Sequence, residues 1–473
     1  MNKHYLLLIL FFLASVPGYS QPHKVIVKMG FDSDELRYWP LDGKHLPYYD
    51  LASVVGVGSD KEIEIILPEG KSLFKVTAGG KSFEIYSAAN SVDTVYLQKD
   101  SLSFSGKNKP YNQYLVTAEK SDQYCWDYIR SNNHELRKVN TLSEFQAIVA
   151  DRKQKDQSGL ENGNFPDEFI KEQQVFADLR YHALFLKKIN SLYRSPELTD
   201  EWMDQFKNTD FQLTNETARR SEWFYEILKD YVCIKRFVLE GVNPQDVAES
   251  FNTFFFDNYC EILGGENLEY ALACLLHDDV YQKDFSKDIP SLYSRFISLF
   301  PHSAYAEILE PEAKMISDLY NQDSDNSKIQ LVDYETEPES FEEMVRPYSG
   351  KVVYVDLWAT WCAPCLESFQ KAGNLKEKLS GLEDVVVFYI SLDRDNAHEK
   401  WQQLINYYNL EGYHYRVNKH TTEIIHTSLG DSNGALMIPR YVIVDKQGKI
   451  AFPEAASPSD LDQVVEQLKS LLK

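Results

Sequence analysis

The sequence lacks any apolar run long enough to span a membrane. Its longest, from Tyr5 to about Pro17, holds about thirteen apolar residues, whereas a spanning helix needs roughly 20. One lysine precedes this run, and a helix breaker and small residues follow it before Gln21, which is typical of a secretory signal. We therefore expect residues 1–20 to be a cleaved signal peptide, with an uncleaved anchor as the alternative. The mature chain would work in the periplasm or another extracytoplasmic space, with no other membrane insertion.

Positive charge is also scarce. The chain has 49 Lys and Arg against 72 Asp and Glu, which gives a formal net charge of -23 and a pI near 4.9. A chain this acidic repels phosphate backbones and anionic lipid head groups. We therefore expect neither nucleic acid nor a membrane surface as a partner. The excess of acidic residues is more simply explained as a means of keeping the protein soluble.

Cysteine is sparse, with six in 473 residues. Four of the six are scattered over a region of helical periodicity, where cysteine usually acts as a small buried hydrophobic side chain. A disulfide such as Cys260–Cys274 is the alternative. These four residues are Cys125, Cys233, Cys260 and Cys274.

The patterning of apolar residues predicts a multi-domain chain, since 473 residues with 43% hydrophobic composition suffice for about three domains. Short alternating runs predict an N-terminal antiparallel, β-sandwich-like domain, with a hairpin turn at Gly79-Gly80. Long amphipathic segments then predict an all-α bundle, and a polar stretch predicts a linker before an α/β domain. The boundaries are 21–115 for the β domain, 116–320 for the helices, 321–328 for the linker and 329–473 for the α/β domain.

The remaining two cysteines lie three residues apart in "VVYVDLWATWCAPCLES", Val352 to Ser368. The β-rich run 351–358 predicts a buried central strand, and Pro364 suits the first turn of a following helix. Cys362 would then lie at a helix N-terminus, where free N–H groups and the helix dipole favour a thiolate. Cys365, one turn further in, could attack a mixed disulfide formed by Cys362. The spacing favours a reversible disulfide.

Two other readings of this pair are weaker. Structural zinc commonly needs a second Cys or His pair at similar spacing, and His398 and His414 lie on a separate predicted helix and strand. A structural staple that closes so small a loop would restrict the unfolded chain little. We therefore expect redox chemistry, no metal and no cofactor.

The C-terminal region resembles the thioredoxin fold, and in particular the TlpA/ResA-type thiol-disulfide oxidoreductases found in multi-domain envelope proteins of Bacteroidetes-type bacteria. "VDLWATWCAPC" matches the strand, tryptophan and Cys-x-x-Cys of that family, and "MIPRYVIVDKQGKI", Met437 to Ile450, resembles its second signature. The segment between the two motifs has room for the helix–strand–helix insertion of this group. The resemblance covers about residues 328–473.

The resemblance implies a role for three residues in the reaction. Cys362 would attack a substrate disulfide, and Cys365 would resolve the mixed disulfide. Asp356 matches the buried aspartate of thioredoxin. On a central strand its carboxyl should be desolvated, with a raised pKa, and should accept the proton of Cys365. A plain polar residue at a sheet end is the alternative for Asp356.

The resemblance also implies a substrate-binding groove. Pro439 matches the family's cis-proline, and Ile438 would offer its backbone to an extended peptide. Trp361 would shield the site and contact substrate, or else fill the core. Arg440 follows the proline, where a small residue is common in thioredoxin, which would place a bulky cation beside the groove.

These features predict an exported disulfide reductase that acts on protein thiols and disulfides and takes electrons from an upstream donor. Its first two domains would dock a partner or form a homodimer. An oxidase or isomerase would use the same pair, but Ala363-Pro364 lacks the histidine common in strong oxidants. A partner-binding envelope protein with a redox-sensitive domain is the other alternative, since more than two thirds of the chain lies outside the resemblance.

Overall fold

The structure, a computed structural model, describes residues 23–472 apart from short internal segments. The segments left out are 42–45, 47–51, 58–61, 68–71, 80, 89–90, 100, 210–215, 244–249, 322–326, 335, 372–377, 380, 383, 394–396 and 432–433. The predicted signal peptide, 1–20, and most of the predicted linker, 321–328, therefore lie outside the described residues. Contacts divide the chain into two units: residues 1–274 with 303–305, and residues 275–302 with 306–473. Each unit is described by itself.

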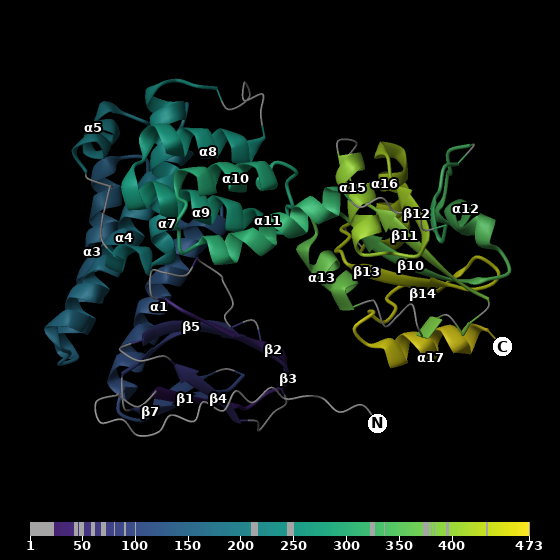
Figure 1. The fold of residues 1–473 in the computed structure, drawn as a ribbon, viewed down its shortest axis with the longest axis horizontal. Coiled ribbons are helices and arrows are strands. Elements are labelled where there is room, and N and C mark those ends of the chain that lie inside the picture. The colour runs from purple at the N-terminus through teal and green to yellow at the C-terminus, as the bar shows by residue number, and fades with distance from the viewer. Residues whose placement is uncertain are drawn as a thin grey trace. The chain divides into compact units, whose positions relative to one another are not determined.

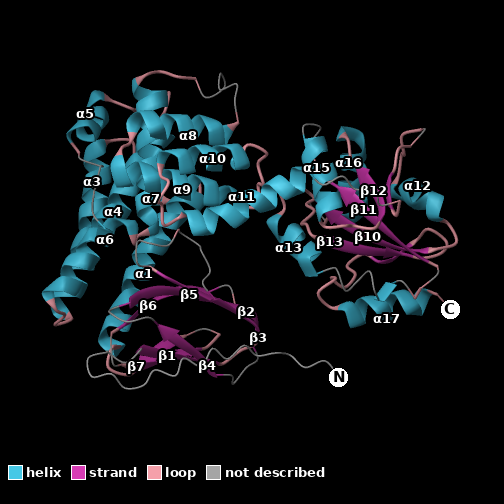
Figure 2. Cartoon of the chain, viewed as in Figure 1, coloured by secondary structure: helices cyan, strands magenta, loops and turns pink. Residues whose placement is uncertain are grey.

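The first unit begins with two four-stranded sheets, drawn in magenta in Figure 2. Their orders are β4-β1-β7-β8 and β3-β2-β5-β6. The strands are β1 (His23–Met29), β2 (Ser33–Pro40), β3 (Ala52–Val57), β4 (Glu62–Leu67), β5 (Ser72–Ala78), β6 (Lys81–Ser87), β7 (Val92–Leu97) and β8 (Leu102–Ser105). Strands of both sheets contribute to one apolar core, which includes Val25, Leu36, Phe74 and Val95.

The predicted hairpin is confirmed, because β5 and β6 pair antiparallel and Gly79 has a positive φ of 56°, while Gly80 lies outside the described residues. The prediction that this region is antiparallel throughout is wrong in one place. β1 lies between β4 and β7 and runs parallel to β7, with Val25 opposite Asp93. Parallel neighbours need a long crossover, and here β2 to β6 intervene between them. Alternation along a strand identifies its buried face but not the direction of its neighbour.

Helices make up the rest of the first unit. They are α1 (Lys109–Arg130), α2 (Glu135–Lys138), α3 (Leu142–Asn162), α4 (Asp167–Ser191), α5 (Asp200–Asn208), α6 (Glu216–Arg219), α7 (Glu222–Cys233), the π-helix η1 (Ile234–Leu239), α8 (Phe251–Ile262) and the start of α9 (Gly265–Tyr281). Several begin at a capping side chain, as the hydroxyl of Thr141 accepts from the amide of Glu144 at α3. α4 packs against α7 and α1 packs against β6, so the helices and sheets of this unit are in contact.

The second unit is built on a six-stranded sheet of order β14-β13-β10-β11-β12-β9. Its strands are β9 (Ile329–Leu331), β10 (Val352–Trp358), β11 (Val385–Ser391), β12 (Gly412–Arg416), β13 (Arg440–Val444) and β14 (Ile450–Phe452). β9, β12, β11 and β10 run parallel, whereas β13 is antiparallel to both β10 and β14. All seven residues of β10 are buried, as predicted for a central strand.

Helices cover both faces of this sheet (Figure 1). The unit's helices after α9 are α10 (Ile289–Leu299), α11 (Ala306–Asn321), α12 (Phe341–Val345), the 3-10 helix η3 (Arg346–Tyr348), α13 (Ala363–Lys371), α15 (His398–Tyr407), α16 (Lys419–Leu429) and α17 (Leu461–Leu471). Val355 and its face of β10 share a core with α12 and α16. Tyr354, on the opposite face, shares a core with α17. The contacts also place α11 against α15.

Across the described part of the chain, no helix has both the length and the apolar character needed to cross a bilayer.

Candidate active site

The two cysteines lie where the central strand passes into a helix. β10 ends at Trp358, a short loop follows, and α13 begins at Ala363 with Pro364 in its first turn. A proline costs nothing there, because the first N–H groups of a helix have no partner within the helix. The motif therefore holds Cys362 at the helix N-terminus and Cys365 within the first turn.

Cys362 and Cys365 form a disulfide, with their Cα atoms 5.3 Å apart. The backbone N–H of Cys365 donates to Sγ of Cys362 at 3.3 Å. After reduction, this donor and the positive end of the helix dipole would stabilise negative charge on Cys362. Cys362 is 4% exposed and Cys365 is fully buried. The geometry therefore favours Cys362 as the thiolate that meets a substrate.

A buried hydrogen-bond network, not expected from the sequence, anchors the loop before Cys362. The carboxylate of Asp393 accepts from the backbone N–H of Thr360 at 2.9 Å and from its hydroxyl at 2.7 Å. The hydroxyl of Ser391, at the end of β11, donates to the same carboxylate at 2.6 Å. The loop and the neighbouring strand are thereby joined by a fully enclosed carboxylate, which should hold the loop rigid. Only the pairing of β10 with β11 brings these residues together.

Asp356 lies in the middle of the central strand, and 2% of it is exposed. The register places Tyr389 of β11 on one side and Tyr441 of β13 on the other. Tyr354 and Trp358 share its face of β10, since side chains alternate along a strand. Oδ1 of Asp356 has no hydrogen-bond partner in the described part of the chain. The carboxyl is thus enclosed by aromatic side chains.

α13 covers this face of the sheet. The ring of Phe369 packs edge-on against Trp358, with centroids 5.0 Å apart, and the hydroxyl of Tyr441 donates to Ser368 at 3.0 Å. Cys365 lies three residues before Ser368 and four before Phe369. Residues at this spacing share one face of a helix. Cys365 therefore lies on the side of α13 that faces the sheet around Asp356. The structure brings together the three residues predicted to act in the reaction.

Burial raises the pKa of Asp356 to about 8, and desolvation is the cause. A carboxyl with this pKa is mostly protonated at neutral pH and gains or loses its proton easily near the pH of a working enzyme. It therefore has the property that a proton acceptor for Cys365 needs.

The raised pKa of Asp356 predicts a pH-dependent cost in stability. The folded protein holds this proton more tightly than the unfolded chain, whose carboxyl keeps the ordinary pKa of 3.8. The stability that protonated Asp356 contributes is therefore complete below pH 3.8 and is lost as the pH rises towards about 8. The free energy of unfolding of Asp356→Asn, relative to that of wild type, should therefore rise with pH across this window, by at most about 1.4 kcal/mol per pH unit. Denaturant unfolding of the oxidised proteins at several pH values measures this difference.

Asp393→Asn is the matched control for that experiment, because it changes a second buried aspartate of the same unit. It should lower the free energy of unfolding, since the carboxylate of Asp393 accepts hydrogen bonds from Thr360 and Ser391. A difference between Asp356→Asn and wild type that stays constant from pH 4 to pH 8 would contradict the raised pKa.

The predicted groove residues lie beside the motif in the sequence or at the start of β13. The Ile438–Pro439 peptide bond is cis, and β13 begins at the next residue. The side chain of Ile438 packs against the core of the sheet. Trp361 is 61% exposed, which excludes the core-filling alternative. Arg440 donates to Glu454 at 2.6 Å, so its charge is paired.

The four other cysteines form no disulfide, so the alternative of a Cys260–Cys274 bridge is not found. Cys125 and Cys274 are buried, as predicted, whereas Cys233 and Cys260 are partly exposed. Burial raises the pKa of Cys125 and Cys233, to about 12 for Cys233, which makes both poor nucleophiles. Among the described residues, no three His, Cys, Asp or Glu side chains are arranged to hold a metal ion.

Comparison with known proteins agrees with this geometry. Residues 350–450 match the family model described as thioredoxin-like. The C-terminal region is thus a thioredoxin-like domain.

More particularly, the chain is similar to the thiol-disulfide oxidoreductase ResA of Bacillus thuringiensis subsp. konkukian, at 28% identity over 129 residues, which cover 27% of this chain and 67% of ResA. The ResA of Bacillus cereus matches equally well. The solution structure of a putative thiol-disulfide oxidoreductase from Bacteroides vulgatus is 28% identical, with a TM-score of 0.23, and the match covers 27% of this chain and 78% of that one.

Proposed function

We propose that this protein is an exported thiol-disulfide oxidoreductase that reduces disulfides of other proteins through Cys362 and Cys365. The observation that carries the proposal is the Cys362–Cys365 disulfide at the N-terminus of α13, above a buried carboxyl of raised pKa. The likeness of this region to ResA supports the reaction class. The signal-like segment 1–20 supports export to the periplasm or a similar space.

The proposed cycle starts from the dithiol form. The thiolate of Cys362 attacks one sulfur of a substrate disulfide, and the other substrate sulfur leaves as a thiolate that takes a proton from water. Cys365 then passes its proton to Asp356, and its thiolate attacks Sγ of Cys362. The second substrate sulfur leaves as a thiolate, which takes up a proton from Asp356 or water. The substrate has gained two electrons and the enzyme has become the disulfide. A dithiol donor outside the chain would return it to the reduced form.

We further propose that the upstream parts select substrates. The domain boundaries remain those predicted: a sandwich-like domain at 21–115, a helical bundle at 116–320 and a linker at 321–328 before the catalytic domain at 329–473. The two sheets that share one core support the first of these parts. Such parts could dock a partner protein or a second copy of the chain and so raise the local concentration of substrate.

Trp361 and the segment before Pro439 are the proposed contacts for substrate. Trp361 and Met437 are exposed at 61% and 81%, which is unusual for large apolar side chains and suits contact with another protein. The backbone of Ile438 would pair with an extended peptide beside the cysteines.

The order of reactivity of the cysteines tests the assignment of the nucleophile. In the reduced protein, a limiting amount of iodoacetamide at mildly acidic pH should label Cys362 first, because the helix N-terminus and the N–H of Cys365 stabilise its thiolate. Cys365 and the buried Cys125 should react much later. Mass spectrometry of the digested protein reports the order directly. Faster labelling of Cys365 would reverse the two roles.

A further inference from the structure

The first unit contains a small cavity where the sheet β3-β2-β5-β6 meets the helices. The volume is ≈ 40 Å³, enough for about three water-sized groups. β2, β5, β6, α1, α4 and α7 all contribute to its lining. The side chains used below are Lys75, Glu84, Asp122, Gln173, Glu222 and Trp223. Neither Cys362 nor Cys365 lines it.

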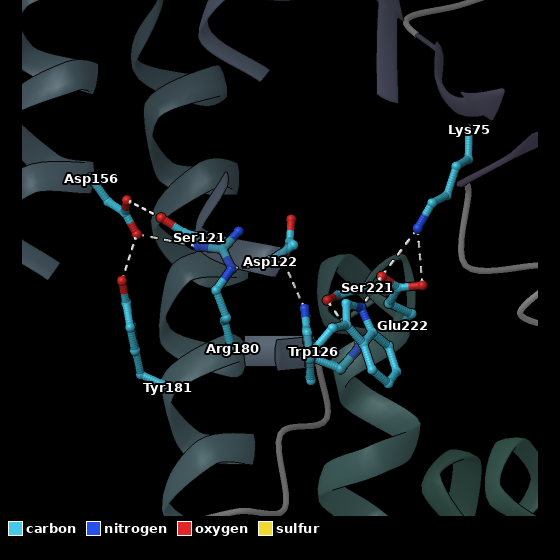
Figure 3. Close-up of polar contacts among 10 residues, drawn as sticks. Lys75, Ser121, Asp122, Trp126, Asp156, Arg180, Tyr181, Ser221 and Glu222 are labelled. Carbon is cyan, nitrogen blue, oxygen red and sulfur yellow. Dashed lines mark hydrogen bonds and ion pairs between the residues drawn. The ribbon is translucent and has the colours of Figure 1, made fainter. Parts of the chain in front are cut away.

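Ion pairs already occupy most of the charged groups around the cavity (Figure 3). Nζ of Lys75 lies 3.0 Å from one carboxylate oxygen of Glu222 and 3.1 Å from the other. Arg180, 5% exposed in its side chain, donates to Asp122 at 2.7 Å and to Asp156 at 3.3 Å. Each of these two cations therefore has its own carboxylate partner.

Glu84 is the carboxyl left over. It makes no hydrogen bond or ion pair within the described part of the chain, although it lines the cavity. Burial raises its pKa to about 8, and the nearby charge of Asp122 adds to the shift. Such a buried group is costly to ionise, and a cation placed beside it would lower that cost.

Asp122 also has acceptor capacity directed at no protein group. Its Oδ1 accepts from Arg180 and from the indole N–H of Trp223, both at 2.7 Å. Its Oδ2 has no hydrogen bond within the described residues. An ammonium group placed between this oxygen and Glu84 would satisfy both carboxyls.

Gln173 needs a hydrogen-bond acceptor, whereas the two carboxyls need a cation. Only 3% of this residue is exposed, it lines the same cavity, and its Nε2 has no hydrogen-bond partner among the described residues. A buried amide N–H without a partner costs about 1–3 kcal/mol. A ligand that pairs with all three side chains therefore needs an oxygen acceptor as well as a cation.

We propose that this cavity binds a small primary amine with an oxygen on the neighbouring carbon, the chemistry of an amino alcohol. The ammonium group would lie between Glu84 and Asp122, with the ring of Trp223 in the wall to add a cation–π contribution. The oxygen would accept from the amide of Gln173. The volume of the cavity limits the bound group to a few heavy atoms. A metal ion does not fit, because the described residues offer no suitable set of ligands for one.

Ethanolamine is the probe for this site, added to the full-length protein in phosphate buffer, because many common buffers are themselves amines. Calorimetry should detect saturable binding with a Kd below about 10 mM, a weak limit suited to so small a ligand. Ethanol, which lacks the cation, should not bind. Ethylamine, which lacks the oxygen, should bind at least about tenfold more weakly, since it leaves the Gln173 amide unpaired.

Two variants separate the two contacts. Glu84→Gln keeps the shape and the neutral charge of the protonated carboxyl, so it should fold normally and yet bind ethanolamine at least about tenfold more weakly. Gln173→Leu should weaken ethanolamine but leave ethylamine unchanged. The matched control is Glu161→Gln, an exposed residue of α3 that should behave as wild type. Circular dichroism and the Tm without ligand report folding.

Proton release provides a second readout. The groups that face Glu84 are Lys75 of β5, Asp122 of α1, Arg180 of α4 and Glu222 of α7. Binding of a cation should ionise Glu84 at pH 7, so the measured heat should differ between phosphate and a buffer of higher ionisation enthalpy. Glu84→Gln should abolish that difference. Absence of ethanolamine binding, or equal affinity of wild type and Glu84→Gln, would overturn the proposal.

Discussion

Cys365→Ala should convert the protein into a trap for its own substrates. Cys362 would still attack a substrate disulfide, because the helix N-terminus and the amide N–H at position 365 remain in place. The resolving thiol is gone, so the mixed disulfide persists. Non-reducing gels of the full-length variant from its native compartment should show adducts that disappear on reduction.

Two companion variants make this result specific. Cys362→Ala should form no such adducts and should lose disulfide reduction by several orders of magnitude, since the attacking group itself is missing. Cys125→Ala controls for the loss of any thiol, because Cys125 is buried and far in the sequence from the motif. It should reduce a generic disulfide at the wild-type rate.

The same experiment separates the proposed reductase from its rivals. A partner-binding protein that needs no thiol chemistry would keep its partners when both cysteines are replaced and would form no adducts in Cys365→Ala. An oxidase or isomerase would form adducts, but its dithiol form would be the weaker reductant. The equilibrium of the Cys362/Cys365 couple against glutathione measures that potential and decides the direction.

Asp356→Asn should slow turnover about 100-fold near neutral pH, the usual contribution of a positioned proton acceptor. The loss should fall on the step in which Cys365 gives up its proton. The first attack by Cys362 uses a thiolate that the helix stabilises, so it should change only a few-fold. Stopped-flow measurement of mixed-disulfide formation and decay resolves the two steps.

The pH profile distinguishes a chemical role of Asp356 from a structural one. In wild type the resolving step should accelerate as the pH rises through about 8, because the carboxylate form accepts the proton. Asp356→Asn should lack this rise. Equal slowing of both steps, with an unchanged profile, would assign Asp356 a packing role instead.

Several parts of the site followed from the sequence because they depend on neighbours along the chain. A β-rich run before Cys362 and a proline just after it are enough to place a buried strand, a loop and a helix start. The Cys-x-x-Cys spacing within one helical turn then lets the two sulfurs meet. The hairpin at Gly79 followed from an equally local pattern.

Other parts depended on which strands become neighbours. The alternation of apolar and polar residues along a strand indicates its buried face, but it does not indicate which strand lies beside it or in which direction that strand runs. The parallel pairing of β1 with β7 was therefore missed. The link between Thr360 and Asp393, 33 residues apart, exists because β11 pairs with β10. Tyr389 and Tyr441 lie beside Asp356 for the same reason, because β11 and β13 pair with β10.

The charged cavity of the first unit shows this division most clearly. In the sequence, Glu84 and Asp122 are ordinary charges on a strand and a helix, and such charges usually face water. The packing of one sheet against the helices encloses them with Lys75 and Arg180, and within the described residues those two cations pair with carboxylates other than Glu84. The sequence by itself determined the redox pair and its local frame, because those contacts span a few residues. Tertiary structure alone decided the environment of each buried charge, because desolvation and pairing depend on groups brought together from distant parts of the chain.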